Sequence, residues 1–85
     1  MKKIIFLKVL VYRKLFLRFD DGTEGVFVIE DEFTNIAKPL NDPKIFSTAK
    51  IIDDGYGIGF ENCDYDICAQ HAYAKTRQYE NADMI

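Results

Sequence analysis

The fold class is decided by residues 14–23, which read Lys14-Leu15-Phe16-Leu17-Arg18-Phe19-Asp20-Asp21-Gly22-Thr23. Positions 15, 17 and 19 lie on one face of an extended strand, and positions 14, 16 and 18 lie on the other. The Asp-Asp-Gly that follows is a turn signal, because Gly22 can adopt the positive φ that closes a hairpin. This stretch therefore predicts an antiparallel sheet.

The segments on either side extend this pattern. Residues 3–11 form an almost continuous apolar run, which indicates a strand, and a turn is expected near Tyr12 and Arg13. Residues 26–30 are the predicted third strand. Asn41-Asp42-Pro43 is typical of a helix start, with Asn41 or Asp42 as the cap and Pro43 at the first helical position, so a short helix is expected over about 42–48. Further strands are predicted at 50–53 and 58–60, around a turn at 53–57, and a helix at 69–78.

These elements predict an α+β fold with a mostly antiparallel sheet of about five strands and two short helices, in the order βββ-α-ββ-α. Residues 31–38 are expected to be irregular or at most a short helical turn, since Pro39 disfavours helix at Lys38. Residues 1–85 form a single domain with a frayed tail at 79–85. The predicted core residues are Leu15, Leu17, Phe19, Phe46, Ile58 and Phe60.

Length and charge limit the function. A chain of 85 residues holds one core and little volume for a deep active site. The net charge of −3 is unevenly spread, because residues 1–19 carry six basic and no acidic side chains. The apolar start is interrupted at Lys8, which argues against a signal peptide, and no apolar run approaches the ~20 residues of a spanning helix. We therefore expect a cytoplasmic protein with no membrane contact and reduced cysteines.

Three motifs follow one another between residues 4 and 73. They are the strand and turn of residues 15–23, the segments Pro39-Leu40-Asn41-Asp42-Pro43-Lys44-Ile45-Phe46 and Gly57-Ile58-Gly59-Phe60, and Asp66-Ile67 leading to Tyr73. Their order resembles the small bacterial family called domain of unknown function 2442. That family usually has Trp at the position of Phe60 and Leu at those of Ile67 and Ala72, which are packing changes. The resemblance implies an α+β fold, a bacterial origin and association with small neighbouring-gene proteins of toxin–antitoxin type, and it brings no established catalytic residue.

One group of side chains has the chemistry of a metal site. Cys63, Cys68 and His71 form C-x4-C-x2-H, and Asp64 or Asp66 could supply a fourth zinc ligand. The spacing is not that of a standard zinc motif, and a sheet core needs no metal to fold. His71 is also the only histidine, so no nucleophilic triad can be assigned. We expect no metal, no cofactor and no enzymatic activity.

A second group has the chemistry of a binding surface. If the first two strands pair, Lys8, Lys14, Phe16 and Arg18 could share one sheet face, with Phe6 nearby. The favoured interpretation places both Phe6 and Phe16 under a helix, with the charged stems at its edges, and the exposed interaction surface is the alternative to it. The pI of about 5.0 argues against nucleic acid.

The leading hypothesis is a non-catalytic protein-interaction or regulatory module whose partner is a small protein or a second copy of the chain. It would bind through an exposed sheet face or edge, not a pocket. The alternatives are a weak nucleic-acid-binding regulator that uses the basic first hairpin, and a metal-dependent activity at Cys63, Cys68 and His71.

Overall fold

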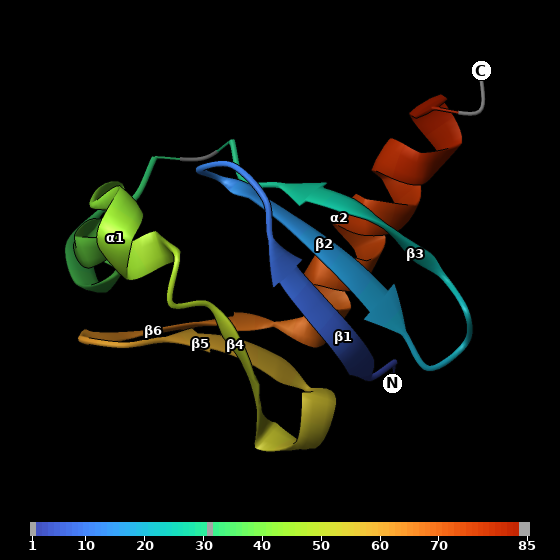
Figure 1. Ribbon diagram of the computed structural model, residues 1–85, viewed down its shortest axis with the longest axis horizontal. Coiled ribbons are helices and arrows are strands. Elements are labelled where there is room, and N and C mark those ends of the chain that lie inside the picture. Colours follow the sequence, from blue (N-terminus) through green and yellow to red (C-terminus); the bar gives the residue numbers. More distant parts are fainter. Residues whose placement is uncertain (1, 31, 84–85) are drawn as a thin grey trace.

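The computed structural model describes residues 2–30 and 32–83 and contains two three-stranded antiparallel sheets (Figure 1). The first sheet has the order β1-β2-β3, with β1 at Ile4–Val9, β2 at Lys14–Phe19 and β3 at Glu24–Val28. The second has the order β4-β5-β6, with β4 at Lys50–Ile52, β5 at Gly57–Phe60 and β6 at Cys63–Cys68. The helical elements are η1 (Asn35–Asn41), α1 (Pro43–Phe46), η2 (Asp53–Gly55) and α2 (Ala69–Asp83).

The α+β class and the antiparallel pairing are confirmed, but the single five-stranded sheet and the order βββ-α-ββ-α are wrong. The strand β6 was not predicted, although Cys63, Tyr65 and Ile67 alternate with Asp64 and Asp66, because aspartate is uncommon in strands. The turn between β5 and β6, at residues 61–62, also contains no Gly or Pro that would signal it. Asn62 makes this turn with a φ of 57°. Asparagine tolerates this left-handed conformation better than most residues, so the turn needs no glycine.

The hairpin between β2 and β3 forms as its sequence predicts. Gly22 has a φ of 89°, its N–H donates to the Phe19 carbonyl at 3.0 Å, and the Phe19 N–H donates to the Thr23 carbonyl at 2.8 Å. The Asp21 carboxylate accepts the Thr23 N–H at 2.9 Å. The turn between β1 and β2 also falls where expected, with Arg13 at a φ of 72°.

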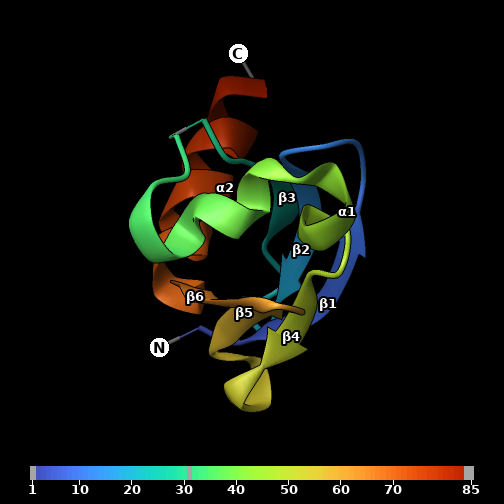
Figure 2. The same ribbon diagram turned by 90° about the vertical axis from the view of Figure 1, so that its left-hand side faces the viewer.

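The core lies between the inner face of the first sheet, α2 and the second sheet (Figure 2). Edge-to-face ring pairs fix α2 on that sheet, Phe19 with Tyr73 at 5.0 Å and Phe27 with His71 at 6.2 Å between centroids. The predicted core is confirmed, since all of its members are buried: Leu15, Leu17, Phe19, Phe46, Ile58 and Phe60.

The short helix α1 begins as predicted. Asp42 is its N-cap and accepts the Lys44 N–H at 2.9 Å, and Pro43 occupies the first turn. The segment before it is more regular than expected, because the 3₁₀-helix η1 runs through Pro39 to Asn41. A 3₁₀-helix forms i→i+3 bonds, so a proline removes one donor without blocking the next bond, here from the Asp42 N–H to the Pro39 carbonyl at 3.0 Å.

The last helix is longer than the sequence suggested. Its backbone is helical from Ala69 to Asp83, so it passes the predicted end near Gln78 and enters the tail at 79–85 for which fraying is expected. Residues 84 and 85 of that tail lie outside the described residues. Within the described part of the chain, no helix is long and apolar enough to cross a membrane.

Replacing Thr76 by valine should stabilise the protein by about 1 kcal/mol. The Thr76 side chain is fully buried on α2, and its hydroxyl has no hydrogen-bond partner among the described residues. Valine keeps the shape and removes the unpaired polar group. Urea titration monitored by circular dichroism measures the change, with Thr76→Ser as the control that keeps the hydroxyl. A valine variant less stable than the native protein would contradict the prediction.

Candidate protein-interaction face

The side chains predicted to form a binding surface lie on one face of the first sheet. In the β1–β2 ladder, Lys8 is opposite Phe16 and Phe6 is opposite Arg18, and directly opposite residues of an antiparallel pair point to the same side. Lys14 follows at the same parity on β2. We call these five residues (Phe6, Lys8, Lys14, Phe16 and Arg18) the basic-aromatic face.

A β-bulge places Phe6 on this face. The register of β1 against β2 shifts between Ile4 and Phe6. Without the shift, these two residues would point the same way, but Ile4 is 2% exposed and Phe6 is 43% exposed. Ile5 takes up the extra position and is also exposed. The bulge therefore adds an aromatic side chain to the solvent side of the sheet.

The two rings of the face pack on each other and on an arginine. The Phe6 and Phe16 centroids are 6.1 Å apart in an edge-to-face arrangement, and the Arg18 guanidinium lies 5.6 Å from the Phe6 centroid. Arg18 also pairs with Glu24 of β3 at 3.1 Å. Both side chains of that pair are about half exposed, so the pair adds little stability, about 0–1 kcal/mol. Lys8 and Lys14 form no ion pair within the described part of the chain and are open to solvent.

None of the described helices covers this face. The helix α2 packs on the opposite side of the sheet, against Phe19 and Phe27. The favoured interpretation, in which Phe6 and Phe16 lie under a helix, is therefore wrong. Phe16 is half-buried by its neighbours on the sheet, among them Val26, which lies opposite it on β3.

The sequence analysis missed an apolar tip beside this face. Leu10 and Val11, in the turn between β1 and β2, are 42% and 64% exposed. The neighbouring Tyr12 holds the turn in place, since its hydroxyl donates to the Leu40 carbonyl at 3.1 Å and its ring lies 5.4 Å from Phe46. Leu10 and Val11 belong to the apolar run of residues 3–11, but the whole of that run is predicted to be a strand, whereas β1 ends at Val9.

The metal-site candidates are not brought together. Cys63 and Cys68 lie at the two ends of β6 and, being five residues apart, point to opposite faces, while His71 packs against Phe27. The described residues contain no group of three side chains able to hold a metal. Cys63 has a structural contact instead, because its Sγ lies 3.7 Å from the Ile36 carbonyl. In a 3₁₀-helix that carbonyl would accept from residue 39, which is a proline and has no N–H.

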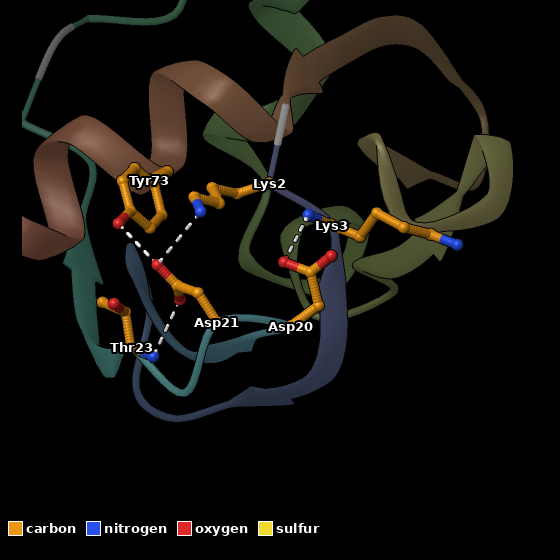
Figure 3. A network of polar contacts seen from close by, with 6 residues as sticks. All are labelled: Lys2, Lys3, Asp20, Asp21, Thr23 and Tyr73. Carbon is orange, nitrogen blue, oxygen red and sulfur yellow. Dashed lines mark hydrogen bonds and ion pairs between the residues drawn. The ribbon is translucent and has the colours of Figure 1, made fainter.

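A carboxylate network ties α2 to the β2–β3 turn (Figure 3). The Asp21 carboxylate accepts the Tyr73 hydroxyl at 2.7 Å and the Thr23 N–H at 2.9 Å, and Lys2 Nζ lies 3.7 Å away. The hydrogen bond from Tyr73, followed by that from Thr23, lowers the pKa of Asp21 from 3.8 to about 2. An aspartate held in its ionised form by such bonds is a poor general acid, so we interpret the network as a structural tie.

Replacing Tyr73 by phenylalanine should raise the pKa of Asp21 towards its ordinary value. Because the folded pKa is about 2, the stabilisation from the ionised carboxylate is complete above about pH 4 and is lost as the pH falls towards 2. In the Tyr73→Phe variant, the stability lost between about pH 4 and pH 2 should be smaller than in the native protein. NMR titration of the Asp21 carboxyl measures the shift, with Tyr56→Phe as the control, and an unchanged pKa would contradict the role of Tyr73.

Among the described residues, two cavities lie away from the basic-aromatic face, one of about 460 Å³ between η1 and the β5–β6 hairpin and one on the inner side of the first sheet. The second cavity has a volume of about 270 Å³ and lies between β3, η1, β6 and α2. Buried apolar residues, including Phe27 and Phe33, line it, with Glu32, Tyr65 and His71 among its polar residues. Its volume is at the lower limit of the ~300–1,000 Å³ usual for ligand sites.

The fold and this surface define a small α+β domain with an uncovered, basic and aromatic sheet face. No family model, curated protein or solved structure matches the chain.

Proposed function

We propose that this protein is a non-catalytic interaction module that binds an acidic surface of a partner protein through the basic-aromatic face. The observation that carries the proposal is the Phe6–Phe16 ring pair, which lies on an uncovered sheet face between basic side chains. Aromatic and arginine side chains are the residue types that most often supply binding energy in protein interfaces.

The charges favour an acidic partner. Glu24 already compensates Arg18, but Lys8 and Lys14 have no such ion pair among the described residues. They would attract an acidic surface and orient its approach. The exposed tip at Leu10 and Val11 adjoins the two lysines in sequence and adds apolar area for contact. A partner with acidic residues around an apolar centre fits this surface.

The resemblance to domain of unknown function 2442 is part of this proposal. It gives the partner as a small protein encoded by a neighbouring gene, of toxin–antitoxin type. A second copy of the chain is the other protein partner that the charge distribution allows, because residues 20–85 carry all fourteen acidic side chains.

Nucleic acid is the competing ligand, since bases could stack on Phe6 and Phe16. Two observations disfavour it. The two rings pack edge to face against each other, and the protein as a whole is acidic, with a pI of about 5.0.

The test uses the variant Lys8→Glu/Lys14→Glu, with Lys44→Glu/Lys50→Glu as the control on exposed lysines elsewhere. A polyglutamate peptide and oligothymidylate serve as probes in NMR titrations of the native protein and both variants. The proposal expects polyglutamate to shift the amide signals of β1 and β2, at least about tenfold more weakly in the first variant and unchanged in the control.

Two results would reject the proposal. Oligothymidylate binding more tightly than polyglutamate, with a steep salt dependence, would favour the nucleic-acid function. Equal responses of the two variants would mean that the basic-aromatic face is not the binding surface. Affinity capture from the native host with the same variants then identifies the partner.

A further inference from the structure

The outer edge of β3 has backbone hydrogen-bonding groups that pair with no described strand. At one end of the β2–β3 ladder the Phe19 N–H bonds to the Thr23 carbonyl, and at the other the Ile29 N–H bonds to the Arg13 carbonyl, at 2.8 and 2.9 Å. The register between them is regular, and bonded and non-bonded pairs alternate along an antiparallel ladder. The odd-numbered residues of β3 therefore bond to β2.

It follows that the even-numbered residues of β3, namely Glu24, Val26 and Val28, direct their N–H and C=O groups away from β2. No described element pairs with β3 on that side, since β3 is the last strand of its sheet. The helix α2 contacts β3 from the inner face and forms no ladder with it (Figure 1).

The other three sheet edges are protected in ways that β3 is not. The edge strand β1 has a bulge at Ile5 and lies against β4, and β4 is only three residues long. The edge strand β6 contacts η1, where the Cys63 thiol approaches the Ile36 carbonyl. By contrast, β3 has no bulge, and its two central outward-facing positions are Val26 and Val28, without the lysine, proline or bulge that usually prevents strand addition.

We infer that the outer edge of β3 accepts an extended segment of a partner protein as a fourth strand of the first sheet. This inference goes beyond the proposed function, because it concerns the backbone of β3 and not the side chains of the basic-aromatic face. The outward-facing groups of Glu24, Val26 and Val28 recognise the backbone of the incoming strand.

The charges next to the edge define the side chains of the incoming strand. Two exposed acidic residues lie on either side of Val26 and Val28: Glu24, which is already paired with Arg18, and Glu30, which forms no ion pair among the described residues. A strand with basic residues at its ends and β-branched apolar residues between them places unlike charges and apolar side chains beside each other. The edge therefore favours a segment opposite in charge to the partner of the basic-aromatic face.

A second copy of the chain fits the edge less well. Figure 1 shows α2 crossing behind β3, and its C-terminal part extends beyond the sheet in both views (Figure 2). In a two-fold arrangement with β3 against β3, the two α2 helices would meet behind the shared edge. A single extended strand carries no helix, so it could pair with β3 without this encounter.

The test uses a synthetic peptide with lysine at both ends and alternating valine and threonine between them. In the free protein, amide hydrogen exchange should be fast at Val26 and Val28 and slow at Gly25 and Phe27. The peptide should protect Val26 and Val28. The same peptide with N-methyl groups on the residues that face β3 should bind at least about tenfold more weakly, because it cannot donate its hydrogen bonds.

A matched pair of variants tests the edge from the protein side. Val26→Pro removes an outward N–H and leaves the ladder to β2 intact, so it should abolish protection, whereas Val26→Thr should keep it. If the proline variant fails to fold, the comparison of the two peptides still decides. Equal affinity of the two peptides, or protection elsewhere, would overturn the inference. So would protection of Val26 in the free protein that disappears on dilution, since the occupant would then be a second copy.

Discussion

Replacing Phe46 by alanine should lower the free energy of unfolding by about 3–5 kcal/mol. The Phe46 side chain is 1% exposed and lies between separate parts of the fold. Its ring is 5.4 Å from that of Tyr12 in the first hairpin and 5.8 Å from that of Phe60 in the second sheet. The loss is a large part of the ~5–15 kcal/mol that stabilises a typical domain.

Denaturant titration followed by circular dichroism measures this loss. Ile36→Ala is the matched control, because Ile36 is 64% exposed and its truncation should cost less than about 0.5 kcal/mol. A loss below about 1 kcal/mol for Phe46→Ala would mean that the ring does not join the two sheets as the structure has it.

Replacing Gly55 by alanine should cost about 2–4 kcal/mol, for two separate reasons. The residue has a φ of 102°, which disfavours any side chain. A Cβ atom at this position would also lie 2.8 Å from the Ile4 carbonyl oxygen and 3.2 Å from the Lys3 Cβ. The glycine therefore lies where η2 closely approaches the start of β1, and a methyl group would push the two segments apart.

Gly22→Ala separates the two reasons. Gly22 has a similar φ of 89°, but a Cβ there would meet nothing within 4 Å. Its replacement should cost only the backbone term, about 1–2 kcal/mol. Equal losses of stability for the two variants, measured by thermal and urea unfolding, would contradict the close approach at Gly55.

The two proposed surfaces divide the charge of the protein. The basic-aromatic face lies on β1 and β2, which carry three of the six basic residues of the first nineteen positions, and the outer edge of β3 begins at Glu24. The Arg18–Glu24 pair marks the boundary between them. Because one surface uses side chains and the other uses backbone, Lys8→Glu/Lys14→Glu and Val26→Pro should affect binding independently.

The candidate face was predictable only in part. Lys14, Phe16 and Arg18 are spaced by two residues, so they lie on one face of their strand whichever strand pairs with it. The position of Phe6 depends on the bulge in β1, and no Gly, Pro or Asn near Ile5 indicates that bulge in the sequence. Whether a helix also covers the outer face was not predictable, because Phe6 and Phe16 make that face partly apolar as well, and α2 packs only on the inner face. The inner face is that of Leu15 and Leu17, which are both fully buried.

Local chemistry in the sequence by itself determined the β2–β3 hairpin, the start of α1 and the six core positions. The turn at Gly22 and the helix start at Asp42 and Pro43 depend only on neighbouring residues. The inward positions of a strand can be read from its alternation of apolar and polar residues without knowing which strand pairs with it. Tertiary structure alone decided the division into two sheets, the outward position of Phe6 and the free edge of β3. These features depend on which strands pair and where the ladder shifts, and pairing energy is distributed over long-range contacts that no short window of sequence contains.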